Sequence, residues 1–135
     1  MSEVSNKKRR YGVMRLVDAT GYRLPLAGVV SILHRISGIF MFALLPFVLY
    51  LLDRSLQSEM TFAMLHFFVA QPIVKLILLA LVWSYLHHFC AGLRHLMMDF
   101  HYGLDKDSAR QSAVTVLIVS LGLTALVGLK LFGVF

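Results

Sequence analysis

Three long apolar stretches constrain this chain more than any other feature of its sequence. They run from about residue 27 to 52, from 72 to 98 and from 112 to 132. A helix needs about 20 residues to cross a hydrocarbon core of roughly 30 Å, and each stretch is long enough. Only helices and closed barrels satisfy all backbone hydrogen bonds in a bilayer, and predominantly apolar stretches of this length are typical of helices. The sequence therefore predicts an all-α membrane protein with three transmembrane helices.

The composition and the placement of charge agree with a membrane protein. Hydrophobic residues make up 59% of the 135 residues and charged residues 15%, whereas a soluble domain is about half apolar and a quarter charged. Seven of the thirteen Lys and Arg residues lie between Lys7 and Arg35. Basic residues at this position contact lipid headgroups, so we expect the lipid bilayer as a partner and no nucleic acid. We divide the chain into a basic N-terminal segment, residues 1–24, and a membrane domain, residues 25–135.

The distribution of basic residues also predicts the orientation in the membrane. Beyond the seven near the N-terminus, the first connection carries two, the second carries three and the C-terminal end carries one. Because Lys and Arg are enriched in cytoplasmic segments, we expect the N-terminus and the 99–111 loop to be cytoplasmic and the C-terminus to face out. The start of the first span and the end of the second then share one leaflet.

Polar residues cluster at the start of the first span, where the sequence reads SILHRISG. Ser31, Arg35 and Gly38 share one helical face at spacings of four and three residues, with His34 on its flank. Snorkelling of Arg35 to the headgroups is one interpretation. A planar guanidinium beside a hydroxyl also suits a carbonyl or carboxylate ligand at the edge of the membrane.

A second polar cluster, HHFCAGLRHLMMD from His87 to Asp99, ends the second span. At 100° per residue, Gly92, His95 and Asp99 fall within about 40° of the direction of His88, which lies roughly 15 Å deep. A neutral histidine hydrogen-bonded to a neighbouring helix explains His88 as well as metal ligation does, and a neutral imidazole is a good iron ligand. His87 points about 100° away from His88 and is interpreted as a packing or partner-contact residue.

Axial spacing separates the roles of His88 and His95. Seven helical residues advance about 10 Å, whereas the two axial nitrogens of one iron are roughly 4 Å apart, so these two histidines cannot ligate the same iron. A second axial ligand would come from His34 or from another chain. His95 would then lie beside the cofactor, with Arg35 and Arg94 available to neutralise carboxylates on its edge.

The two clusters carry a resemblance to a known family. The patterns SxxHRxSG and HxxxGxRHxxxD, in a chain with three spans, resemble the cytochrome b membrane-anchor subunit of succinate dehydrogenase, respiratory complex II. The resemblance covers roughly residues 23–135, and the motif residues are Ser31, His34, Arg35, Ser37, Gly38, His88, Gly92, Arg94, His95 and Asp99. The segment from Asp18 to Pro25 departs from the Arg-Pro-Leu-Ser-Pro-His-like pattern of many members.

The resemblance implies specific roles for the polar residues. His88 matches the axial ligand of the iron of haem b, with the other ligand supplied by a smaller partner anchor. His34 and Arg35 match positions near the haem propionates, where we also expect His95. Ser31 and Arg35 match residues of the ubiquinone site.

The resemblance also implies partners. This chain would be the larger of two anchors in a heteromeric helix bundle, with an iron–sulfur subunit and a flavoprotein subunit docked on the cytoplasmic side. It would contribute to quinone reduction within the enzyme complex and be inert in isolation. The short N-terminal segment fits a bacterial inner membrane, which makes the C-terminus periplasmic.

Two alternatives stay open. One is a haem-bearing anchor of a fumarate reductase that uses menaquinol. The other is a non-haem membrane assembly subunit, or a small transporter subunit, in which the histidines hydrogen-bond neighbouring helices. The sequence lacks the inverted repeats and paired broken helices that are typical of many transporters, which weighs against the transporter.

Overall fold

The computed structural model describes residue 21 and residues 24–134. These described residues form four helices and no strand, and the helices are α2 (Leu26–Gln57), α3 (Glu59–Val69), α4 (Pro72–Asp99) and α5 (Lys106–Leu131). Helices α2, α4 and α5 are each long and apolar enough to cross a membrane. The predicted all-α fold with three membrane helices is confirmed. The basic N-terminal segment lies almost entirely outside the described residues, and so do five of the eight residues from Asp18 to Pro25 that depart from the family pattern.

Two of the long helices extend beyond the apolar stretches that predict them. Helix α2 continues to Gln57 through residues whose side chains bond to one another on its exposed surface. Gln57 donates to the Asp53 carboxylate at 2.7 Å, and Arg54 donates to Gln57 at 3.2 Å. Helix α5 begins six residues before its predicted span, because the Asp105 side chain accepts from the backbone N–H of Ser108 and caps the helix.

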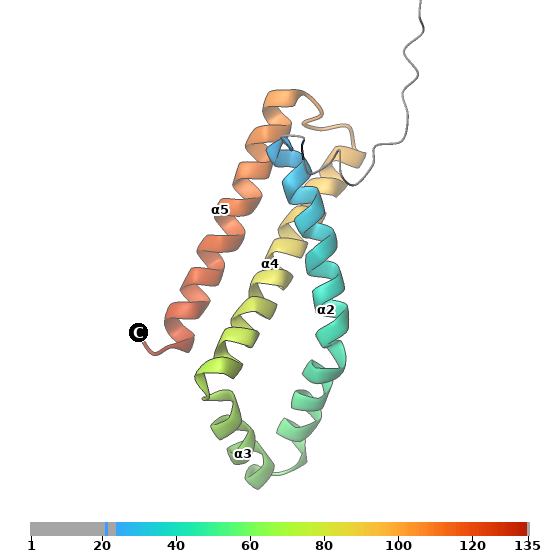
Figure 1. Ribbon diagram of the computed structural model, residues 1–135. Helices are drawn as coiled ribbons and strands as arrows, with labels where there is room; N and C mark the ends of the chain where they lie inside the picture. Colours follow the sequence, from blue (N-terminus) through green and yellow to red (C-terminus); the bar gives the residue numbers. More distant parts are fainter. Residues whose placement is uncertain (1–20, 22–23, 135) are drawn as a thin grey trace, which may run out of the picture.

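The first connection contains the short apolar helix α3, which follows α2 after a single residue. Ser58 and Thr61 form a reciprocal capping box, in which each side chain accepts from the other residue's backbone N–H. In Figure 1, α3 lies at the end of the molecule opposite the α4–α5 connection.

Helix α4 is the centre of the molecule and packs against both α2 and α5. Figure 1 shows the start of α2, the end of α4 and the α4–α5 connection together at the top, while the α2 and α4 ribbons diverge toward α3. The polar clusters of the first two spans therefore lie at one end of the molecule. The side of the membrane that this end faces stays a prediction.

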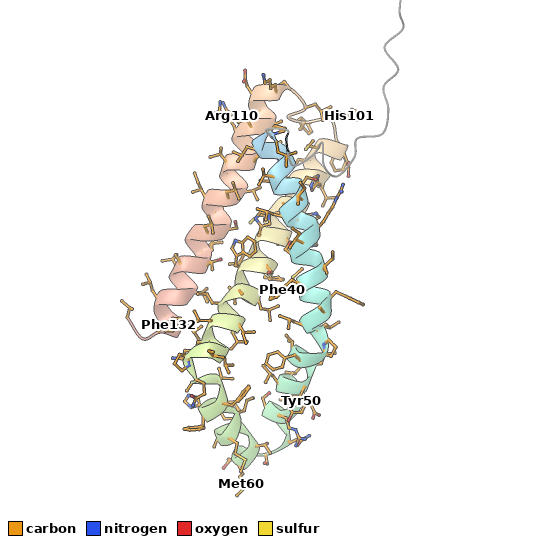
Figure 2. All side chains as sticks on the ribbon, in the orientation of Figure 1. Phe40, Tyr50, Met60, His101, Arg110 and Phe132 are labelled. Carbon is orange, nitrogen blue, oxygen red and sulfur yellow. The ribbon has the colours of Figure 1, made fainter. Side chains whose placement is uncertain are left out.

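The core inside the chain is small and consists of small residues. Val30, Ala91, Ala113 and Val116 pack together where the three long helices meet. Most large apolar side chains point outward instead, as the sticks in Figure 2 show. An apolar exterior of this extent requires lipid or partner subunits around it.

Helices α4 and α5 also contact each other at the end of α5, away from the α4–α5 connection. Gly128 of α5 lies against Leu79 of α4, where an added Cβ would come within 3.4 Å of the Leu79 side chain. At the far end, Lys75 Nζ donates to the carbonyl of Leu131 at 2.9 Å, which satisfies one of the last carbonyls of α5.

Candidate functional site

The imidazoles of His34 on α2 and His88 on α4 stack where the two helices meet. Their ring centroids are 4.1 Å apart and their planes are inclined by 18°. His88 Nδ1 lies 3.0 Å from the backbone carbonyl oxygen of His34 and 3.3 Å from the Ser37 hydroxyl. The Ser37 hydroxyl itself donates to the same carbonyl at 2.8 Å. One carbonyl oxygen therefore anchors both a serine and a histidine.

The contact of His88 with a carbonyl determines its tautomer. A carbonyl oxygen only accepts, so Nδ1 carries the hydrogen and donates it to His34. The other nitrogen, Nε2, then holds the lone pair. Metal-ligating histidines are oriented in the same way, by a hydrogen bond from the nitrogen that does not bind the metal.

Glycines on both helices allow this close approach. A Cβ on Gly38 would lie 3.0 Å from His88 Cε1, which is tighter than nine in ten real Cβ contacts. A Cβ on Gly92 would lie 3.6 Å from His34 Nε2, an ordinary contact. Gly38 is therefore the glycine that the His88 position requires, while Gly92 lies against the His34 ring.

His34 also contacts the second histidine of the α4 cluster. The His34 and His95 rings are 5.1 Å apart and inclined by 50°. His34 thus lies between His88 and His95, and the structure brings these three predicted residues together.

An open hollow on the side of the molecule exposes this cluster. It has a volume of about 490 Å³ and is lined by His34, Arg35, Gly38, Ile39, Phe42 and His88. Arg35 is exposed beside it. Ile39 and Phe42 are 70% and 79% exposed, although both are large and apolar. The hollow therefore opens onto an apolar surface of α2 that lipid or a partner subunit must bury.

Ser31 lies one helical turn before Arg35 and is half-buried. It is not among the residues that line the hollow. The structure therefore groups four of the five predicted site residues closely, and places Ser31 one turn further toward the end of the molecule.

His87 and Arg94 point to α5, away from this cluster. His87 is fully buried, stacks on Trp83 at 5.3 Å and has Nδ1 3.5 Å from the hydroxyl of Ser120. It is a packing residue, one of the two roles predicted for it. Arg94 donates from Nε to the Ser112 hydroxyl at 3.0 Å. The structure therefore places Arg94 against α5 and does not bring it together with Arg35 at the hollow.

Ser37 is the residue whose contribution the sequence analysis did not recognise. It is fully buried and contacts His88 directly. Val30 and Ser37 are seven residues apart, which places both on the same face of α2, and both are buried. That spacing would have indicated a hydroxyl facing the core, although not its partner on α4.

Comparison with known proteins supports the resemblance seen in the motifs. The family model described as succinate dehydrogenase/fumarate reductase transmembrane subunit matches residues 15–127. The chain is 35% identical over 113 residues to the succinate dehydrogenase cytochrome b556 subunit of Coxiella burnetii, a match that covers 83% of this chain and 90% of that protein. It is 35% identical over 105 residues to the subunit of the same name from Paracoccus denitrificans, covering 78% and 81% of the two chains.

A mitochondrial protein shows similarity of the same degree. The chain is 33% identical over 117 residues to the succinate dehydrogenase cytochrome b560 subunit of Bos taurus, covering 82% of this chain and 68% of that protein. The family model, the named relatives and the three long apolar helices all indicate a transmembrane subunit of the same family. The chain therefore belongs to the family of succinate dehydrogenase and fumarate reductase transmembrane subunits, which are membrane anchors.

Proposed function

We propose that this chain is the larger membrane anchor of a succinate:ubiquinone oxidoreductase, that it binds haem b together with a smaller anchor, and that it helps to form the ubiquinone-reduction site. The observation that carries the proposal is the His88 imidazole, held by Nδ1 against α2 at the edge of an open hollow. The cytochrome b names of the relatives favour haem as the cofactor. The chain alone would be inert.

His88 has the properties that an axial ligand of haem iron needs. Its Nδ1 hydrogen bond leaves the lone pair on Nε2, and Gly38 leaves room for the ring beside α2. A haem bound here would supply one-electron redox chemistry, with a potential that depends on its ligands and burial. His34 stacks on the His88 ring, His95 contacts His34, and Arg35 lines the same hollow as His88. These three side chains would hold the haem carboxylates. The second axial ligand would come from the smaller anchor.

Ser31 and Arg35 are the proposed quinone-binding residues. They lie one turn apart on α2, at the end of the molecule where the polar clusters gather. The hydroxyl of Ser31 would donate to a quinone oxygen. The exposed guanidinium of Arg35 would stabilise the negative charge that develops on the quinone during reduction.

The proposed arrangement gives a partner to two of the exposed surfaces. The smaller anchor would cover the α2 surface that contains Ile39 and Phe42. The iron–sulfur and flavoprotein subunits would dock at the end formed by the start of α2 and the α4–α5 connection. The excess of basic residues makes this end cytoplasmic in a bacterial inner membrane and the C-terminus periplasmic.

Replacing the proposed iron ligand tests haem binding. In the assembled complex, His88→Ala should abolish or strongly alter the absorption bands of the reduced haem, because the substitution removes the Nε2 lone pair that would bind the iron. His66→Ala, on the exposed surface of α3, is the matched control and should leave the spectrum unchanged. An unchanged spectrum in His88→Ala would remove His88 as the ligand.

Replacing the quinone-site residues tests the second part of the proposal. Ser31→Ala and Arg35→Lys should lower the rate of quinone reduction by about tenfold or more, since a hydrogen bond to a developing charge is worth roughly 1.5–3 kcal/mol. Succinate oxidation with an artificial soluble acceptor should stay intact. Arg54→Lys, at the other end of α2, serves as the control. Equal loss of both activities would mean that Ser31 and Arg35 act on assembly and not on quinone.

The relatives named above are succinate dehydrogenase subunits, which favours this direction of reaction over fumarate reduction with menaquinol. Extraction and identification of the quinone bound to the purified complex distinguishes the two. Ubiquinone supports the proposal, and menaquinone supports the fumarate reductase alternative.

A further inference from the structure

Arg94 is a buried cation that the proposed haem and quinone sites do not use. It is 6% exposed on α4, five residues before the helix ends. Its Nε donates to the Ser112 hydroxyl at 3.0 Å and its Nη2 to the Ala109 carbonyl at 3.4 Å. Both acceptors are uncharged, and no carboxylate within the described part of the chain pairs with it. A buried charge without a counter-charge is costly, so an anion beside Arg94 would be stabilising.

A groove between α4 and α5 leads to this guanidinium. Its volume is about 380 Å³. One end of the groove lies where α4 ends and α5 begins, which is the end expected at the membrane surface. The residues near it include the polar side chains of Arg94, Tyr102 and Ser108. The residues deeper along the helices are mostly apolar and include Cys90, Leu93, Val116 and Val119.

The groove is separate from the histidine cluster. On a helical wheel, Leu93 and Met97 lie about 140° and 180° from His88, so they line the opposite side of α4. In Figure 2, the labelled Arg110 and His101 mark the end of the molecule at which the groove begins. From Ser108 to Val119 the groove follows α5 for roughly 16 Å. A ligand that fits it has a polar, anionic end at the membrane surface and an apolar part directed into the bilayer.

We propose that this groove binds one anionic glycerophospholipid. The phosphate lies at Arg94, whose planar guanidinium donates to phosphate oxygens, with the hydroxyls of Ser108 and Tyr102 at the same end. One acyl chain lies along Leu93 and Val119 between the two helices. The uncompensated charge of Arg94 selects a headgroup of net negative charge over a zwitterionic one. The inference requires insertion of the chain into a bilayer and does not depend on haem or quinone binding.

Native mass spectrometry of the assembled complex tests the lipid site. The complex is stripped of lipid in detergent and titrated with phosphatidylglycerol or with phosphatidylcholine of the same acyl chains. We expect tight binding of phosphatidylglycerol, and an affinity at least about tenfold lower in Arg94→Gln. Arg110→Gln removes an exposed positive charge near the same end of α5 and should leave the affinity unchanged. The spectrum of the haem should stay unchanged in both variants.

A second pair of variants tests the groove without changing Arg94, in case Arg94→Gln does not fold. Val119→Phe places a ring in the groove, whereas Ile118→Phe places it on the neighbouring exposed position outside the groove. Val119→Phe should lower the affinity for phosphatidylglycerol about tenfold and Ile118→Phe should not. Equal binding of the two lipids, equal loss in Arg94→Gln and Arg110→Gln, or unchanged binding in Val119→Phe would each overturn the proposal.

Discussion

The His34 carbonyl is the acceptor around which the histidine cluster is arranged. It accepts from the Ser37 hydroxyl on its own helix and from His88 Nδ1 on the neighbouring helix. The side chain of the same residue stacks on His88. Residue 34 thus contributes through both its backbone and its ring, and substitution of the ring alone would leave the hydrogen bond to His88 in place.

Gly38→Ala tests whether the position of His88 depends on the missing side chain. The added Cβ would lie 3.0 Å from His88 Cε1, so the imidazole must move by a few tenths of an ångström. Alanine is favoured over glycine in a helix by about 1 kcal/mol, and we expect displacement of the stacked imidazoles to offset that gain. The assembled complex should show a shifted haem spectrum and no rise in the midpoint of thermal unfolding.

Gly122→Ala is the matched control for this substitution. Gly122 lies within α5, and nothing would come within 4 Å of an added Cβ. The higher helix propensity of alanine should raise the midpoint of thermal unfolding without a change in the haem spectrum. If both variants were equally stabilised and had the same spectrum, Gly38 would have no role in placing His88.

Helix α4 presents two adjacent histidines to two different helices. His88 bonds to α2, whereas His87 is buried against Ser120 of α5. Both contacts follow from the rotation of about 100° between consecutive helical residues. The small residues Ser120 and Gly128 of α5 face α4 within the same chain, so both are used in intramolecular packing.

The first turn of α5 depends on the charge of Asp105. The Ser108 backbone N–H, and then its side chain, hold the pKa of the Asp105 carboxyl below the ordinary value of 3.8. Because the folded pKa is lowered, this cap stabilises the helix above the ordinary pKa, and the stabilisation is lost as the pH falls through the lowered folded value. The NMR signal of the Ser108 amide in the full chain should titrate at a pH below 3.8.

Asp105→Asn separates the cap from its charge. Asparagine also caps helices but does not ionise, so the Ser108 amide signal should no longer titrate. The midpoint of thermal unfolding should also no longer show the decrease at low pH that protonation of Asp105 causes. Asp107→Asn removes a carboxylate from the same turn without removing the cap and serves as the control. An unchanged Ser108 titration in Asp105→Asn would show that another group causes it.

At the scale of the whole molecule, the placement of residues decides which polar groups form the site. Arg35 belongs to the polar motif of the first span and Arg94 to that of the second. Arg35 lines the hollow at His88, whereas Arg94 is bonded to α5 on the other side of α4. A helical wheel places Arg94 about 120° from His88, but it gives only the angle of a residue on its own helix, so the structure was needed to show that α5 lies on that side of α4.

The sequence by itself determined the three membrane helices, the end of the molecule at which the polar clusters meet and the axial separation of His88 and His95. These follow from local properties, namely the length of apolar runs, the distribution of charge and the helical repeat. Only the tertiary structure showed that Ser37 and the His34 carbonyl anchor His88, that Gly38 makes room for it and that Arg94 belongs to a different groove. Each of these depends on how two helices are rotated against each other, which packing across the whole chain decides and no single segment encodes.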